Sequence, residues 1–344
     1  MKLFKLKSKD FFMKREILVL AILVVIVLIA GIFNRDFINI NNLLGIVVAS
    51  LILIMLSIGE TFVIITKGID VSVGAIMGLS AVCMGVCANV NPFLSYFVAI
   101  FVGLLAGAIN GIGVSVIGIP PIIMTLGTMG LYRGMMPIIT GGGWVDSVPQ
   151  SIKVLAQIKI VGVNLFLIIV FFIVVITTVI LKYFYVTRAF YAVGGSEEGA
   201  FNLGIRVKLT KFFAYLIAGF FSSLAAIIFV TQLSFVPMNA GNGEEMRAVA
   251  SSVLGGVSLS GGVGSPVSAA IGAIFLTTIN SVLIFMKVPS YWNDAIAGFI
   301  LITIVLLDYR VRRYLESIIK SSRFSSGKLK NEIEKVTRGI IKND

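Results

Sequence analysis

The sequence predicts an all-α integral membrane protein, and three observations support this fold class. Of the 344 residues, 58% are hydrophobic and only 13% are charged, whereas an average soluble domain has about 25% charged residues. The mean hydropathy is +1.04, and many apolar runs approach the roughly 20 residues that a membrane-crossing helix needs. Basic residues gather beside these runs, as the positive-inside rule describes.

The apolar runs predict about ten transmembrane helices. In order, they cover residues 17–33, 43–66, 71–90, 92–117, 122–140, 160–182, 211–231, 246–259, 266–287 and 291–308. The run at 246–259 is short and rich in serine and glycine. The first run follows basic residues, as a signal sequence would, but it ends at Asn34-Arg35-Asp36 without a small-residue cleavage pattern. We therefore expect an uncleaved first span.

The distribution of charge predicts that both termini lie in the cytoplasm. Basic residues crowd the N-terminal segment 1–16 and the C-terminal tail 309–344, on either side of a transmembrane domain at 17–308. Two termini on one side require an even number of spans. Ten spans also put residues 183–210 inside, and this segment and its edges are basic. The basic residues there are Lys182, Arg188, Arg206, Lys208 and Lys211.

Composition and motifs exclude several kinds of function. The net charge of +12 comes from the flanks of apolar runs, and without a folded basic domain we expect no nucleic-acid binding. The chain has no histidine, and Cys83 and Cys87 share one helix face in an apolar run, so we expect no metal site. No P-loop or hydrolase motif is present. We therefore expect neither catalytic residues nor a cofactor on this chain; if the chain is a pump, another polypeptide must supply the energy.

Small residues recur at four-residue spacing, a pattern that lets helix backbones approach closely in lipid. The residues are Gly103, Gly107 and Gly111, then Gly130 and Gly134, then Ser268 and Gly272. In addition, residues 66–75 and 254–273 interrupt apolar runs with polar residues or glycine. Broken segments in both halves of a chain are typical of transporters with internal repeats.

Polar residues within apolar runs are costly and are therefore candidates for function. Glu60 is either a buried or snorkelling acid or part of a path. Asp70 either caps the following helix or contacts a substrate. Arg133 either pairs with a carboxylate or faces an aqueous cavity. The candidates for a substrate path are Asp70, Ser72, Asn110, Thr125, Arg133, Asn293 and Asp294.

The longest connections on the predicted outer side are residues 141–159 and 232–245. Both hold aromatic or apolar residues among polar ones, which fits solvated loops with interfacial anchors as well as a docking surface. The docking candidates are Trp144, Asp146, Asn239 and Asn242.

The segment "AVGGSEEGAFNLGI" at 192–205 is a polar segment on the predicted inner side. Ser196 is expected to begin a short helix with Glu197 and Glu198 in its first turn, where the helix dipole favours acids. Gly204 fits a left-handed C-terminal cap. Because two helical turns are marginal alone in water, we expect the helix to need a partner surface; a solvated loop is the alternative.

Several stretches resemble the sugar-type permease subunits of bacterial ABC importers, in the ribose/galactose branch. They are "GIDVSVGAIMGLSA", "IPPIIMTLGTMGLYRG", "AVGGSEEGAFNLGIRV", "EMRAVASSVLGGVSLSGGVGSPVSAAIGA" and "YWNDAIAGFILITIVLLD", and their order and spacing match nearly along the whole chain. Within this branch, "KGIDVSVG", "TLGTMGLYRG", "TGGGWVDSVP" and "PSYWNDAIAG" are most similar to the autoinducer-2 subgroup. Lys67 replaces the first glycine of the Gly-Gly-Ile-Asp of ribose-type relatives, and ribose, rhamnose or another pentose remain alternative substrates.

The resemblance implies a bacterial plasma-membrane permease that works with three partners. These are a cytoplasmic ATPase, a second permease subunit and an external substrate-binding protein docking around Trp144 and 236–245. Two related permease chains are favoured over two identical ones. The resemblance further implies that 192–205 is the ATPase-coupling loop, with Gly194, Gly195, Glu197, Glu198, Ala200, Gly204 and Ile205 as its contact residues. An ion-coupled transporter using Glu60, Asp70 or Asp294, and a receptor or scaffold without transport, are the alternatives.

Overall fold

The structure is a computed structural model that describes residues 2–289, 292, 295, 298, 299, 302 and 303. The chain divides into two units, Met1–Gly298 and Phe299–Asp344, and everything below concerns the first. The candidates Asn293 and Asp294, the tail 309–344 and most of the predicted span 291–308 lie outside the described residues.

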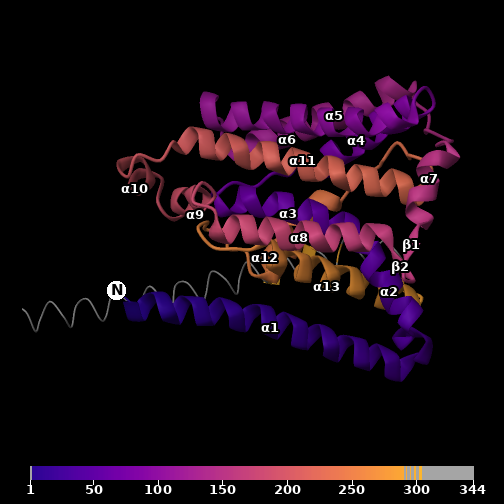
Figure 1. Cartoon of the computed structure of the whole chain (residues 1–344), viewed down its shortest axis with the longest axis horizontal. Coiled ribbons are helices and arrows are strands. Elements are labelled where there is room, and N and C mark those ends of the chain that lie inside the picture. Colours follow the sequence, from indigo (N-terminus) through magenta and orange to yellow (C-terminus); the bar gives the residue numbers. More distant parts are fainter. Residues whose placement is uncertain (1, 290–291, 293–294, 296–297, 300–301, 304–344) are drawn as a thin grey trace, which may run out of the picture. The chain divides into compact units, whose positions relative to one another are not determined.

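The described residues are almost entirely helical, which confirms the all-α prediction (Figure 1). The helices are α1 (Lys2–Phe33), α2 (Ile40–Ala49), α3 (Leu51–Ile65), α4 (Val73–Ala88), α5 (Pro92–Ile112), α6 (Pro121–Thr140), α7 (Gln150–Gln157), α8 (Leu165–Tyr183), α9 (Arg188–Gly195), α10 (Glu197–Asn202), α11 (Val207–Leu233), α12 (Glu244–Gly255) and α13 (Pro266–Phe285). A 3₁₀ turn, η1, covers Arg35–Ile38, and a π-helical turn, η2, covers Gly113–Ile117. A short antiparallel pair, β1 (Lys159–Ile160) and β2 (Val163–Asn164), precedes α8.

Six of the described helices are long and apolar enough to cross a membrane: α1, α5 with η2, α6, α8, α11 and α13. Helices α2 and α3 are together long and apolar enough for a further span, but they bend by 41° at Ser50, as a broken span or a re-entrant loop would. The predicted spans 71–90 and 246–259 contain helices of only 16 and 12 residues. At 1.5 Å per residue these are about 24 and 18 Å long, against about 30 Å of hydrocarbon. The count of ten and the side of the termini therefore stay predictions.

Helix α3 forms the centre of the described unit because it is apolar on all sides, which is the pattern of a buried helix. Nearly all its residues are buried, and it lies between α11 on one side and α12 and α13 on the other (Figure 1). The chain ends α3 at Thr66 and turns sharply through Lys67, whose φ is +66°. The α3–α4 link, residues 66–72, thus runs through the interior.

The small-residue pattern has different consequences on different helices. A Cβ atom on Gly103 of α5 would lie 2.5 Å from the carbonyl oxygen of Gly219 on α11, so the two backbones are in contact, as predicted. Gly272 of α13 packs equally closely against Ser251 of α12. The prediction is wrong for Gly130 and Gly134 within this chain, because no described atom outside their own helix lies within 4 Å of a Cβ there.

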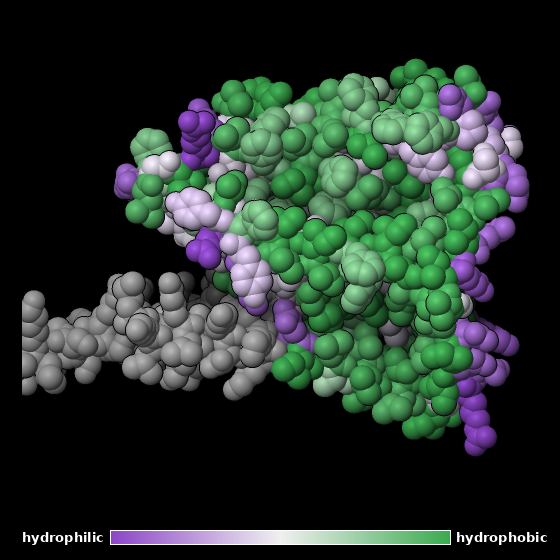
Figure 2. Space-filling model, viewed as in Figure 1, coloured by the Kyte–Doolittle hydropathy of each residue, from purple (hydrophilic) through white to green (hydrophobic). Residues whose placement is uncertain are grey.

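The surface agrees with a membrane protein. Figure 2 shows apolar side chains covering the flanks of the helices, with hydrophilic residues gathered at the two helix ends. Large apolar residues stand exposed along the long helices, for example Phe101 of α5 at 65% and Phe171 of α8 at 59%. Such a surface would be unfavourable in water and is stable in lipid.

Candidate functional site

The 192–205 segment folds as the sequence predicts. Ser196 is the N-cap of α10, and its Oγ accepts a hydrogen bond from the Gly199 N–H at 3.0 Å. Glu197 and Glu198 occupy the first turn, and Gly204 has a left-handed φ of +79° after the helix. The short-helix prediction is confirmed, and its basis is local capping chemistry.

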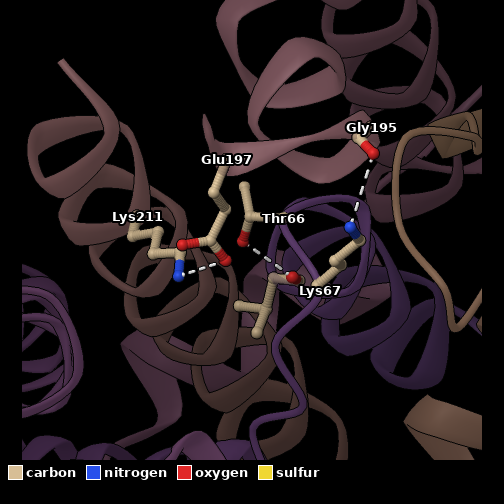
Figure 3. Close-up of polar contacts among 6 residues, drawn as sticks. Thr66, Lys67, Gly195, Glu197 and Lys211 are labelled. Carbon is tan, nitrogen blue, oxygen red and sulfur yellow. Dashed lines mark hydrogen bonds and ion pairs between the residues drawn. The ribbon is translucent and has the colours of Figure 1, made fainter. Parts of the chain in front are cut away.

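Side-chain contacts attach this segment to the α3–α4 link and to α11. Lys67 Nζ donates to the carbonyl oxygen of Gly195 at 3.4 Å, and Lys211 Nζ pairs with Glu197 Oε1 at 2.6 Å (Figure 3). In the same view, Thr66 Oγ1 donates back to the Val63 carbonyl at 2.8 Å, which holds the end of α3 in place. The segment is therefore held at two separate parts of the helical core.

A further contact ties α9 to the turn between α12 and α13. The Gly262 N–H donates to the Ile65 carbonyl at 2.9 Å, and Gly194 packs directly against both groups. The Tyr191 hydroxyl donates to the Gly264 carbonyl at 2.8 Å. The end of α3, the 256–265 turn and α9 thus form one backbone contact around Gly194.

The predicted coupling residues divide into two groups. Gly194 and Ala200 are buried inside the protein, and Ile205 is half-buried. Gly195, Glu197, Glu198 and Gly204 are exposed and are open to a partner. Beside them stand Phe201 and Leu203, which are 72% and 80% exposed. These two side chains were not among the contacts predicted from the sequence. Their presence as large apolar residues in a polar segment could have indicated a contact surface.

Candidates for the substrate path meet in a buried cluster around Asp70. Asp70 Oδ1 accepts from the Ser72 N–H at 2.9 Å and from the Ser72 hydroxyl at 2.6 Å. Asn110 Nδ2 donates to Ser72 Oγ at 2.7 Å and to Asp70 Oδ2 at 3.4 Å. Thr125 Oγ1 accepts from the Val71 N–H at 3.3 Å. Asp70, Ser72, Asn110 and Thr125 are all fully buried, so the cluster is closed in this conformation.

Two further polar residues belong to the cluster. Thr128 Oγ1 donates to Asn110 Oδ1 at 2.7 Å; it follows Thr125 by three positions on α6, a spacing that places both on one face. Glu60 Oε1 accepts from the Asp70 N–H at 3.0 Å, which confirms the buried, hydrogen-bonded reading of Glu60. Among the described residues, Glu60 Oε2 and the Tyr215 hydroxyl have no hydrogen-bond partner.

The capping interpretation of Asp70 is wrong, because its carboxylate accepts no N–H of the helix that follows. Helix α4 begins at Val73, and the residue at its N-cap position is Ser72, which makes no side-chain cap bond. Asp70 instead accepts the N–H of Ser72 itself. The carboxylate thus orders the turn that leads into α4, one step before the helix.

Arg133 forms an ion pair, so the pairing alternative is confirmed. Its Nη2 lies 2.7 Å from Glu245 Oε1, and the side chains are 33% and 8% exposed, respectively. Arg133 stands on α6 and Glu245 on α12, so the pair joins two helices that are far apart in the sequence.

The loops predicted to dock a partner are joined to each other. Val145 and Val236 exchange backbone hydrogen bonds of 3.0 Å, and the rings of Trp144 and Phe235 stack at 6.0 Å between centroids. Trp144, Asp146, Asn239 and Asn242 are all exposed. Asn239 and Asn242 also line a cavity of about 290 Å³ next to the Glu244–Arg247 ion pair.

The apolar surface of the long helices defines a membrane protein, and its family makes it a transport permease component. The chain belongs to the family "branched-chain amino acid transport system / permease component", whose model matches residues 42–305. This membership and the apolar helices make it a multi-pass protein of the inner membrane.

Among individual relatives, the chain is similar to the "autoinducer 2 import system permease protein LsrC" of several bacteria. Identity to the Escherichia coli (strain K12 / DH10B) protein is 38% over 313 residues, covering 90% of this chain and 92% of the relative. For Yersinia enterocolitica it is 40%, covering 89% and 85%, and for Yersinia pestis (strain Pestoides F) 39%, covering 89% and 88%. These relatives are transport permeases and not enzymes, and the resemblance read from the motifs is confirmed. No solved structure matches the chain.

Proposed function

We propose that the chain is the membrane-spanning permease subunit of an ATP-driven ABC importer that carries autoinducer-2 or a closely related small sugar. The observation that carries this proposal is the 37–40% identity to autoinducer 2 import permeases over about nine tenths of the chain. Rhamnose, ribose and other monosaccharides remain alternative substrates, because the external binding protein would make the main selection.

Three partners follow from this proposal. A separate cytoplasmic ATPase would bind ATP and Mg²⁺, since this sequence has no P-loop. An external binding protein would dock on the joined loops around Trp144 and Asn239. A second permease subunit would cover α6, and the autoinducer-2 resemblance favours a related chain over an identical copy. Gly130 and Gly134 support the position of the second permease subunit on α6. Their four-residue spacing suits helix contact in lipid, and no other described helix of this chain packs against these two glycines.

The contacts around the 192–205 segment suggest how ATP hydrolysis would reach the substrate path. In this proposal the ATPase binds α10 and the residue after it through contacts with Glu198, Phe201 and Leu203. A movement of α10 would pull on Lys67 through the Gly195 carbonyl. Lys67 belongs to the α3–α4 link, which also carries Asp70. The same movement would therefore reposition the buried cluster that α3, the α3–α4 link, α5 and α6 share.

The second broken segment is linked to the same point. Gly262, in the turn between α12 and α13, donates to the carbonyl of Ile65 at the end of α3. Both interrupted segments would thus respond together when α9 and α10 move. Such paired, broken segments at one site are the usual machinery of alternating access.

Reconstitution tests the proposal directly. The chain would be placed in liposomes with its cognate ATPase, second permease and binding protein, and uptake of labelled autoinducer-2 measured with and without ATP. We expect uptake only with ATP and the ATPase. Uptake driven by an ion gradient, without the ATPase, would instead establish a secondary transporter and refute the proposal.

A charge reversal tests the ATPase contact. The double variant Glu197→Lys/Glu198→Lys is expected to insert into the membrane but to lose ATPase assembly in a pull-down. Because Glu197 also pairs with Lys211, the single variant Glu198→Lys is the sharper reagent. Normal assembly and uptake in both variants would refute the assignment of α10 as the coupling helix.

A further inference from the structure

A groove with a cavity volume of about 780 Å³ runs between α9 and the first turns of α11. We call it the α9–α11 groove. Its larger apolar and aromatic lining residues include Tyr185, Val186, Phe190, Leu209, Phe213 and Ile217. Several of these face outward: Tyr185 is 85% exposed, and Phe213 is 43% exposed. The groove is therefore open to its surroundings and has a largely apolar lining.

Two cations that line this groove have no partner in the described part of the chain. Arg188 and Arg206 both line it and both are exposed. Neither guanidinium forms an ion pair or side-chain hydrogen bond with a described residue. By contrast, Lys211 in the first turns of α11 is paired with Glu197. The groove thus combines an apolar surface with unpaired positive charge, which suits an amphiphile carrying negative charge.

The position of the groove along α11 favours a lipid over a soluble protein. Helix α11 has 27 residues and passes as a membrane span, and Lys211 marks its polar end. Phe213 and Ile217 lie further along the helix; at 1.5 Å per residue, Ile217 is about 9 Å beyond Lys211. A soluble protein would have to enter the hydrocarbon region to reach this surface, whereas an acyl chain lies there already.

The segment of the protein that leads from α8 into the groove also has the composition of a membrane interface. The end of α8 and the residues after it are Tyr183, Phe184 and Tyr185, all more than half exposed. Lys182 Nζ stands 5.1 Å from the centre of the Tyr183 ring. Aromatic residues with neighbouring lysine or arginine typically lie at the headgroup level, which puts Arg188 and Arg206 within reach of lipid phosphates.

We propose that the α9–α11 groove binds one anionic phospholipid of the membrane, with its phosphate held by Arg188 and Arg206 and an acyl chain against Phe213 and Ile217. Charge complementarity selects an anionic headgroup over a zwitterionic one. Because Leu203, Gly204 and Ile205 also line the groove, the bound lipid would contact the end of the 192–205 segment. This site does not depend on which substrate the protein carries.

Native mass spectrometry of the full-length purified chain tests this proposal with phosphatidylglycerol and phosphatidylcholine as probes. The wild type is expected to retain one phosphatidylglycerol in preference to phosphatidylcholine. In Arg188→Gln/Arg206→Gln, the affinity for phosphatidylglycerol should fall about 30-fold, because each basic residue near an anionic membrane surface contributes roughly five-fold. Lys208→Gln, which removes a neighbouring charge that does not line this groove, should change it little.

A second measurement locates the lipid and separates folding from binding. A Phe213→Trp variant should be quenched more strongly by brominated phosphatidylglycerol than by brominated phosphatidylcholine, and the arginine substitutions should abolish that difference. Equal retention of both lipids by the wild type, or equal loss in Lys208→Gln, would overturn the proposal. So would arginine variants that keep the lipid but lose ATPase assembly, since the groove would then be part of the ATPase contact.

Discussion

Gly194 and Gly195 are neighbours in the sequence, yet alanine should affect them very differently. A Cβ on Gly194 would lie 2.5 Å from the Gly262 amide nitrogen and closer still to the Ile65 carbonyl oxygen. Ordinary Cβ contacts begin near 3.4 Å, so α9 would have to move by about 1 Å or more. That movement would break the hydrogen bond from the Gly262 N–H to Ile65. No described atom outside its chain neighbours would meet a Cβ on Gly195.

The structure gives a magnitude for Gly194→Ala. Overpacking typically costs about 1–3 kcal/mol, and the lost hydrogen bond adds about 1 kcal/mol, so destabilisation of about 2–4 kcal/mol is expected. Thermal unfolding of the purified chain, and ATP-driven uptake by the assembled transporter, measure the two consequences. Gly195→Ala is the matched control and should unfold like the wild type. If the two variants had the same unfolding temperature and uptake, the close packing around Gly194 would be refuted.

Three further predictions concern other contacts. Gly219→Ala should destabilise the chain by about 1–3 kcal/mol through overpacking against α5, whereas Gly130→Ala should leave the isolated chain at least as stable and weaken pairing with the second permease in a co-purification. Arg133→Gln should lower the unfolding temperature because it leaves Glu245 buried and unpaired, and adding Glu245→Gln should recover part of the loss. Burial raises the pKa of Tyr191 to about 12, so its stabilising contribution holds below pH 10 and falls between pH 10 and 12; Tyr191→Phe should flatten that part of the stability profile.

Local chemistry decided which parts of the site could be predicted. The short helix at 197–202 follows from a capping serine and a terminal glycine within a few residues, and both are visible in the sequence. The partner of Arg133 could not be named in advance, because Glu245 lies 112 positions away. Asp70, Asn110 and Thr125 were likewise separate candidates until folding brought their helices together.

The span count shows a different limit. Hydropathy finds apolar runs but does not measure how long the resulting helix is. The run at 246–259 became α12, which begins at Glu244 and ends at Gly255, too short to cross the hydrocarbon alone. The run at 43–66 became two helices bent at Ser50. In both regions the length and the bend of the helices depend on packing against other helices, which a single window of sequence does not contain.

Helix α11 is one uninterrupted rod of 27 residues, about 40 Å long, and its two ends carry different contacts. Lys211 near its start holds Glu197, and Phe235 just after its end stacks on Trp144. In the proposed importer, the end near Lys211 would lie beside the ATPase, and the end near Phe235 would lie beside the binding protein. If α11 moves as one body between two conformations that each partner binds with different affinity, the two affinities depend on each other, and thermodynamic linkage requires that dependence to be equal in both directions. Docking of a loaded binding protein would then change the affinity of the chain for the ATPase. Binding of the ATPase would change its affinity for the binding protein by the same factor.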